Sequence, residues 1–171
     1  MTYHKLFEIY TEQITALAEA GADLLVVETM LGIDEMTVAL EAAQSVCALP
    51  VLCSMTVQAD GSGYFGGTCV EAVETLQELG AAAVGINCST GPDQLESLVR
   101  NMRQAAKVPL LVKPNAGMPE ISPEGEAIYS MGPAAFAQHM RTLIDAGAAL
   151  VGGCCGTDPR YISALRDVLP R

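Results

Sequence analysis

A recurring junction constrains the fold of this chain more than any other feature, because each copy joins a helical segment to a short apolar run. Glycine marks the junction in "AEAGADLLVVET", "QELGAAAVGINC" and "IDAGAALVGGCC", and proline marks it in "ALPVLCSMT" and "KVPLLVKPN". Glycine after a helix adopts the left-handed conformation that ends it. The junctions predict strands at about 23–28, 51–56, 82–87, 109–114 and 148–153.

Helical periodicity fills the segments between these strands. The first helix, over 5–20, has an apolar face that predicts a buried side, formed by Leu6, Ile9, Tyr10, Ile14, Leu17 and Ala18. Further helices are expected near 35–47, 70–78, 93–106, 133–146 and 159–168. Strands that are apolar on both faces and are joined by helices form parallel β/α units.

Polar residues recur at the C-terminal end of each expected strand. The longer connections, at 57–69 and 115–132, also follow the C-terminal ends of strands. A side with these features is typical of the functional face of a β/α barrel. We therefore expect an α/β fold of the (β/α)8 TIM-barrel type, represented over residues 1–171 by about five C-terminal units. The N-terminal units of a full barrel are expected to be lost or to come from another chain. An open doubly wound sheet, which needs no further strands, is the alternative.

Composition excludes several classes of protein. The 171 residues are 50% hydrophobic and 17% charged, which indicates a globular chain with a sizeable core. A net charge of −11 with 9 Lys and Arg residues argues against nucleic acid or an anionic membrane as a partner, since both need clustered basic side chains. No apolar run is long enough to cross a membrane, and "MTYHKLFEIYTEQ" is not a signal peptide. We expect a cytoplasmic protein whose cysteines are reduced.

Three cysteines stand where strands are expected to end: Cys88 in "GINCSTG", and Cys154 and Cys155 in "GGCCGT". The strand ends of a barrel converge, so these thiols are expected to lie close together. Three thiolates with one open position form a catalytic zinc site. Adjacent cysteines reach one ion only if the backbone kinks, which the surrounding glycines permit. The adjacent pair alone has two other interpretations, a redox-active vicinal disulfide or two buried apolar side chains.

Taken together, these motifs resemble those of the zinc-dependent homocysteine S-methyltransferases, including the homocysteine-binding barrel of cobalamin-dependent methionine synthase. The resemblance runs from "EAGADLLVVET" through "GINCSTGP" and "KPNAGMP" to "GGCCGTDPRYI". It implies Zn²⁺ bound by Cys88, Cys154 and Cys155, with homocysteine sulfur in the fourth position. It also implies that Glu28 and Asn115 hold the amino-acid end of homocysteine. The glycine-rich acidic segment on the first strand of the family's barrel has no counterpart here.

The resemblance implies methyl transfer to homocysteine, giving methionine, with no catalytic residue beyond the metal site. Coordination to zinc deprotonates a thiol that is otherwise mostly protonated at neutral pH. Relatives use methylcobalamin, S-methylmethionine or betaine as methyl donor, and "PNAGMP" favours the corrinoid. The alternatives are a non-catalytic partial barrel that needs a complementary N-terminal half-barrel or self-associates, and a vicinal-dithiol redox protein.

Other polar residues also have structural interpretations. On sequence alone, Glu28 is also typical of a residue that caps the following helix or pairs with a lysine, and Asn115 is also typical of a turn. Thr56 and Asn87 end strands without a strong functional case, and Lys113 is either a Schiff-base lysine or faces the surrounding helices. The residues expected to lie away from the site are Cys47, Cys53, Cys69, His4 and His139.

Overall fold

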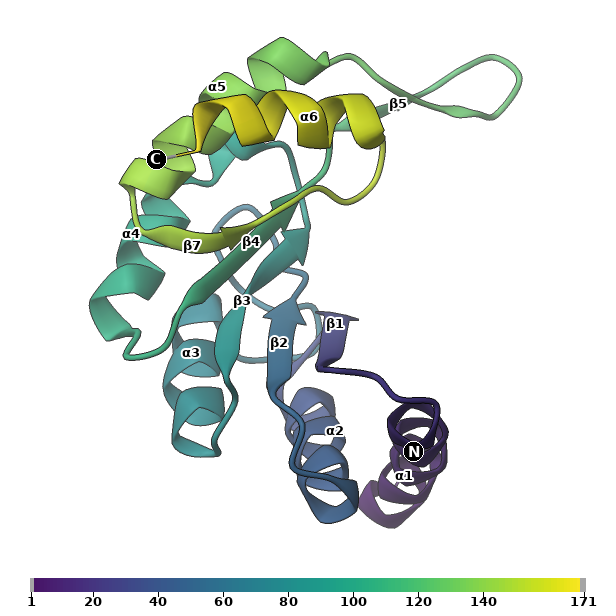
Figure 1. The fold of residues 1–171 in the computed structure, drawn as a ribbon. Helices are drawn as coiled ribbons and strands as arrows, with labels where there is room; N and C mark the ends of the chain where they lie inside the picture. The colour runs from purple at the N-terminus through teal and green to yellow at the C-terminus, as the bar shows by residue number, and fades with distance from the viewer. Residues whose placement is uncertain (1, 170–171) are drawn as a thin grey trace.

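Five parallel strands form the main sheet of the computed structural model, which describes residues 2–169 (Figure 1). They lie side by side in chain order, β1-β2-β3-β4-β7. Their bounds are Leu25–Met30 for β1, Val51–Met55 for β2, Ala83–Cys88 for β3, Leu110–Pro114 for β4 and Ala148–Val151 for β7. A separate antiparallel hairpin pairs β5 (Pro119–Ile121) with β6 (Ala127–Tyr129).

Helices alternate with the strands of the main sheet. Their bounds are Tyr3–Glu19 for α1, Ile33–Val46 for α2, Cys69–Glu78 for α3, Glu96–Ala105 for α4, Pro133–Asp145 for α5 and Pro159–Val168 for α6, with a 3-10 turn, η1 (Pro92–Gln94), before α4. Gly21, Gly80 and Gly147 end helices with φ of 86°, 92° and 119°, which confirms the predicted junctions. None of the helices within residues 2–169 combines the length and the apolar character that crossing a membrane requires.

The strand order confirms the expected α/β fold with about five consecutive parallel β/α units. It excludes the doubly wound alternative, because a doubly wound sheet reverses its strand order part way across. The expected strand limits agree with the structure to within two residues. Hairpin β5–β6, inside the connection 115–132, was not predicted, since each of its strands has only three residues.

Alternate strand residues separate the two faces of the main sheet. The helix-covered face contributes to the core with Leu25, Val51, Cys53, Met55, Val84, Ile86, Leu110 and Val112. The intervening residues lie on the opposite face, which we call the inner face. Its apolar residues include Val26, Leu52, Leu111 and Leu150, none of which belongs to the hydrophobic core. Glu28 and Asn87 follow on the same face toward the carboxyl ends of the strands.

Helix α1 is less buried than its apolar face predicts. Ile14 is buried, but Ile9 and Leu17 are 41% and 46% exposed. The helix lies at the margin of the fold and packs mainly against α2 (Figure 1). Part of its apolar face therefore remains in solvent, and only part of the predicted side is buried.

Candidate metal centre

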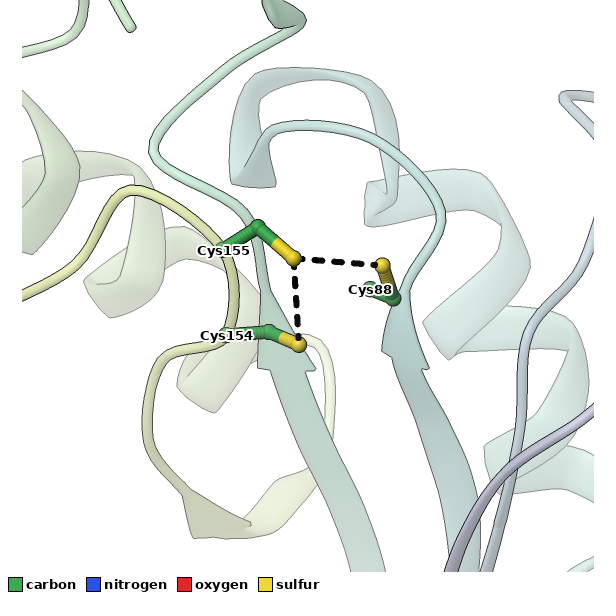
Figure 2. A group of neighbouring side chains, drawn as sticks. All are labelled: Cys88, Cys154 and Cys155. Carbon is green, nitrogen blue, oxygen red and sulfur yellow. Dashed lines mark hydrogen bonds between the residues drawn. The ribbon is translucent and has the colours of Figure 1, made fainter. Parts of the chain in front are cut away.

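Three thiols meet at the carboxyl ends of β3 and β7 (Figure 2). Cys88 is the last residue of β3, and Cys154 and Cys155 lie in the turn that follows β7. The Sγ atoms of Cys88 and Cys155 are 3.8 Å apart, and those of Cys154 and Cys155 are 4.0 Å apart. All three sulfurs lie within 4.8 Å of one another, so the expected convergence of these thiols is present.

These separations fit a single tetrahedral metal ion. Zinc–sulfur bonds of about 2.3 Å place two tetrahedral ligands about 3.8 Å apart, whereas the sulfurs of a disulfide are about 2.05 Å apart. Cys154 and Cys155 are free thiols, so the structure shows the reduced form of the adjacent pair. Three protein ligands leave one tetrahedral position for another ligand, as in catalytic zinc sites. Among residues 2–169, these three cysteines are the one group of at least three Cys, His, Asp or Glu side chains that lie close enough together to share a metal ion.

Backbone hydrogen bonds turn the adjacent sulfurs toward one side. The Cys154 N–H donates to the Pro114 carbonyl over 2.8 Å. The Cys154 carbonyl accepts from the Thr157 hydroxyl over 2.7 Å, which closes a turn. The Cys155 N–H donates to Asn115 Oδ1 over 3.1 Å. The end of β4 therefore holds the pair in place, and the kink expected from the glycines is this turn after β7.

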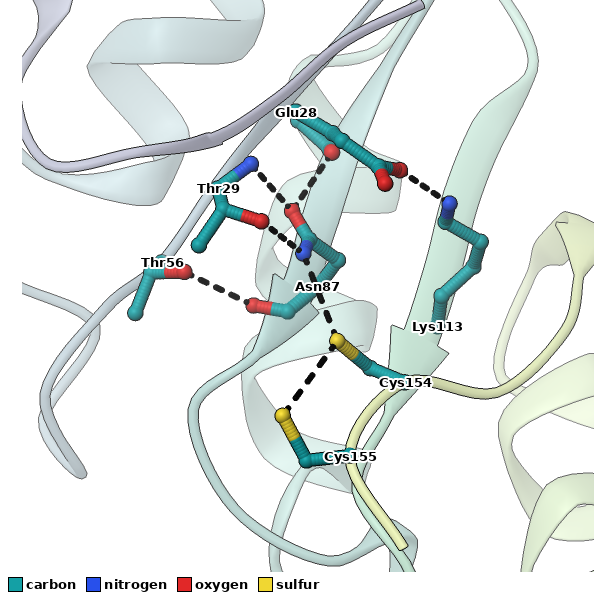
Figure 3. Close-up of polar contacts among 8 residues, drawn as sticks. Glu28, Thr29, Thr56, Asn87, Lys113, Cys154 and Cys155 are labelled. Carbon is teal, nitrogen blue, oxygen red and sulfur yellow. Dashed lines mark hydrogen bonds and ion pairs between the residues drawn. The ribbon is translucent and has the colours of Figure 1, made fainter. Parts of the chain in front are cut away.

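Asn87, directly before Cys88, connects three strands to the thiols (Figure 3). Its side chain is buried, and Oδ1 accepts from the Thr29 N–H over 2.9 Å and from the Ser54 hydroxyl over 2.6 Å. Its Nδ2 donates to Thr29 Oγ1 over 2.8 Å and to Cys154 Sγ over 3.8 Å. The sequence alone gives Asn87 no strong functional role, although an amide next to a strand-end cysteine is a signal that points to it.

Thr56, the other strand-end residue without a strong functional case in the sequence, supports the backbone around Asn87 and Cys88. It is buried, and its hydroxyl donates to the backbone carbonyl of Asn87 over 3.2 Å (Figure 3). Ser89 Oγ donates to the same carbonyl over 3.3 Å and accepts from the Val57 N–H over 3.0 Å. The backbone that carries Cys88 is thus fastened from β2 and from the residue that follows it.

The electrostatics of the three thiols favour a bound cation. Burial above all, and then the neighbouring Cys154 and Cys155 thiols, raises the pKa of Cys88 to about 11. Burial followed by Cys155 also raises the pKa of Tyr129, which shows that the phenol at the end of β6 lies near the thiols. A positive ion among the sulfurs would offset this effect, because it stabilises the thiolate form.

Glu28 and Lys113 form an ion pair across the inner face (Figure 3). Their side chains are 43% and 25% exposed. The preceding Val112 belongs to the helix-covered core, so Lys113 points the other way. This corrects the alternative in which Lys113 faces the surrounding helices. Contact between residues of β1 and β4, with β2 and β3 between them, shows that the inner face is concave.

The two residues expected to bind homocysteine have different surroundings. Asn115 is 5% exposed and lies beside the thiols, with Oδ1 engaged by the Cys155 N–H. Glu28 directly precedes Thr29, whose N–H donates to Asn87. The Glu28 carboxylate forms an ion pair with Lys113. Asn115 therefore contacts the turn that carries two of the thiols, whereas Glu28 lies two strands away from β3, on β1.

The remaining cysteines and the histidines occupy other elements. Cys47 follows α2, Cys69 begins α3, and Cys53 is buried in β2, where burial raises its pKa to about 12. His4 and His139 lie in α1 and α5. In the part of the chain that the structure describes, none of the five joins the three-thiol group.

This fold and this thiol site occur in a chain whose residues 1–169 match the family model described as Homocysteine S-methyltransferase. The chain belongs to the homocysteine S-methyltransferase family. Among curated relatives, the methionine synthase of Mycobacterium leprae is 30% identical over 99% of this chain and 14% of its own length. The methionine synthase of Mycobacterium tuberculosis is 31% identical over 94% of this chain, again 14% of that protein.

Solved structures agree with the family assignment. The homocysteine methyltransferase MmuM from Escherichia coli, in its apo form, superposes with a TM-score of 0.80 at 25% identity, over 99% of this chain and 58% of that one. Its metallated form gives 0.80 and 25%, over 98% of this chain and 52% of that one. The chain thus spans about one seventh of the methionine synthases and just over half of MmuM.

Proposed function

We propose that this chain is the metal- and homocysteine-binding part of a homocysteine S-methyltransferase, with zinc held by Cys88, Cys154 and Cys155. The observation that carries the proposal is the triangle of free sulfurs, with edges of 3.8 Å and 4.0 Å, at converging strand ends. Membership of the family supports it, as does the existence of a metallated form of MmuM.

Zinc, when bound there, supplies a positive centre that lowers the pKa of a thiol in the open fourth position. The chain's own residues present the three sulfurs. Pro114 and Asn115 fix the backbone of Cys154 and Cys155, while Asn87 holds the end of β3 against β1 and β2. A donor set ordered in this way avoids rearrangement when the metal and the substrate bind.

In the proposed reaction, homocysteine sulfur forms a bond to the methyl carbon. The bond between that carbon and its donor breaks with both electrons remaining on the donor, and the thiol proton is released to water. The product is methionine. Methylcobalamin, S-methylmethionine and betaine are the candidate donors, and the corrinoid is the one that "PNAGMP" favours.

Glu28 and Asn115 are proposed to bind the amino-acid end of homocysteine. The Glu28 carboxylate already accepts a cationic partner in Lys113, so it suits the substrate ammonium group. Asn115 Oδ1 accepts from the Cys155 N–H, which leaves the Nδ2 group, a donor, to bind the substrate carboxylate.

We also propose that further β/α units complete the inner face. Among the described strands, β1 pairs only with β2, and β7 pairs only with β4. Val26 on β1 and Leu150 on β7 are 44% and 37% exposed, which is unusual for apolar side chains in a barrel interior. A complementary half-barrel, or a second copy of this chain, would cover these side chains and the unpaired strand edges.

The metal content of the purified chain tests the zinc site. We expect about one tightly bound zinc per chain, because three thiols form an open tetrahedral site. Cys88→Ala should abolish tight zinc binding. This loss of affinity is larger than the roughly 10–100-fold loss expected when a residue that only hydrogen-bonds to a metal ligand is removed. The measurement is elemental analysis after dialysis against a weak chelator.

Cys47→Ala is the matched control, because Cys47 is a free, partly buried thiol outside the group. It should retain the zinc content of the unmodified chain. Equal zinc loss in both variants would remove the assignment. Metal-free protein with a titratable bond between Cys154 and Cys155 would instead support the redox alternative.

A further inference from the structure

We propose that Asn87 is a positioning residue that donates a hydrogen bond to the Cys154 thiolate and so adjusts how that sulfur binds metal. The inference rests on the proposed zinc site. It assigns a role to a side chain that is not itself a ligand. The argument depends on three observations: the orientation of the amide, its burial, and its link to β1.

The orientation of the Asn87 amide follows from its neighbours. The backbone N–H of Thr29 is only a donor, so the Asn87 atom that faces it at 2.9 Å is the oxygen. Ser54 Oγ reaches the same oxygen at 2.6 Å. Nδ2 must therefore face Thr29 Oγ1 at 2.8 Å and Cys154 Sγ at 3.8 Å, with one proton available for each.

Burial holds the amide in that orientation. Asn87 is 1% exposed and Ser54 is 0% exposed. Rotation of the amide would leave buried donors and acceptors unpaired, which costs about 1–3 kcal/mol for each group. The N–H therefore points at Cys154 before any metal arrives. A hydrogen bond to a thiolate is charge-assisted and withdraws electron density from the sulfur.

The same amide also fixes the end of β1. Thr29 has φ 61°, a left-handed conformation that β-branched residues rarely adopt. Its N–H and its hydroxyl both bond to Asn87, which supports this conformation and places the neighbouring Glu28. One buried side chain thus connects a proposed metal ligand with a proposed substrate residue (Figure 3).

Asn87→Asp tests the inference, because Asp keeps the accepting oxygen and replaces Nδ2 with an oxygen that cannot donate. We expect zinc affinity, measured by chelator competition, to fall roughly 10–100-fold. In the cobalt(II)-loaded chain, the sulfur-to-metal charge-transfer band should move to lower energy, because the sulfur becomes more electron-rich. Ser54→Ala is the matched control: it removes a bond to the same amide but leaves the N–H toward sulfur, so affinity and band should not change.

The outcomes separate this inference from the proposed function. If the unmodified chain binds neither zinc nor cobalt, the proposed function fails. If it binds both and folded Asn87→Asp has the same affinity and the same band, the inference is overturned. If circular dichroism shows that Asn87→Asp does not fold, NMR of the unmodified chain loaded with cadmium-113 decides. We expect a scalar correlation between an Asn87 side-chain amide proton and the metal, and its absence would overturn the inference.

Discussion

Backbone strain at the scale of single residues is concentrated around the thiols. Thr29, Cys88 and Ser89 have φ of 61°, 61° and 62°, in the left-handed region. This conformation costs an L-residue roughly 1–2 kcal/mol, so the surrounding hydrogen bonds must over-determine it. Thr29 directly follows Glu28, and the pair Cys88–Ser89 directly follows Asn87. Strain is thus located where the proposed substrate and metal contacts are made.

Asn115→Asp distinguishes the role of the accepting Oδ1 of the Asn115 side chain from that of its donating Nδ2. The carboxylate keeps an acceptor for the Cys155 N–H but loses Nδ2 and repels the substrate carboxylate. Homocysteine binding, measured by calorimetry on the zinc-loaded chain, should weaken by about tenfold or more, corresponding to one charge-assisted hydrogen bond. Zinc content should not change.

Glu96→Gln is the control for the change of charge, because Glu96 pairs with Arg100 on the surface of α4. It should bind homocysteine as the unmodified chain does. Unchanged homocysteine affinity in Asn115→Asp, with zinc verified, would remove Asn115 from the substrate site.

At the scale of elements, hairpin β5–β6 packs directly on the thiol turn. The ring of Tyr129, the last residue of β6, fills the space next to Gly156, where an added Cβ would lie 2.3 Å from the ring. Gly156 also has φ 78°. The hairpin therefore covers the residue that follows the adjacent cysteines, and the absence of a side chain there permits the contact.

Gly156→Ala should destabilise the fold more than Gly125→Ala does. Gly125, in the hairpin turn, has φ 85° but no atom within 4 Å of an added Cβ, so Gly125→Ala introduces the backbone strain alone. Gly156→Ala adds the clash with Tyr129, and overpacking typically costs about 1–3 kcal/mol. The free energies of unfolding, from urea titration followed by circular dichroism, should differ by about that amount. Equal losses would show that the ring simply moves away.

At the scale of the whole molecule, the sheet formed by residues 2–169 is curved but open. The Glu28–Lys113 ion pair spans the inner face, while Val26 and Leu150 remain exposed at its two margins. Unpaired edges next to apolar side chains favour association. The proposed completion by further β/α units would remove both features, because a closed barrel has no edges.

The mass of the chain in solution should therefore rise with concentration, measured by light scattering coupled to gel filtration. Val26→Lys should reduce this association, since a charged edge strand resists pairing. Ile121→Lys, at a 71% exposed position on the hairpin, should leave the association unchanged. A constant monomer mass in all three proteins would contradict the proposed completion of the sheet.

Catalysis by the isolated chain should be weak for the same reason. Without an opposite wall, the methyl donor is not held in line with the sulfur, and positioning of reactants contributes up to about 7–11 kcal/mol to catalysis. Methionine formation from homocysteine, with each of the three donors tested in turn, should increase when a chain bearing the first three β/α units is added or fused. Turnover that the added units do not change would contradict this expectation.

The sequence by itself determined the order of strands and helices, the ends of the helices, and which polar residues stand at the carboxyl ends of the strands. These features depend on hydrophobic periodicity and helix caps, which involve residues close together in the chain. Cys88, Cys154 and Cys155 could be grouped on that basis. Tertiary structure decided the rest: Thr29 and Asn87 are 58 residues apart, and Glu28 and Lys113 are 85 apart. Such pairs depend on strand register and on sheet curvature, which place side chains in three dimensions and which local patterns do not encode. The orientation of the Asn87 amide toward Cys154 follows only from those long-range contacts.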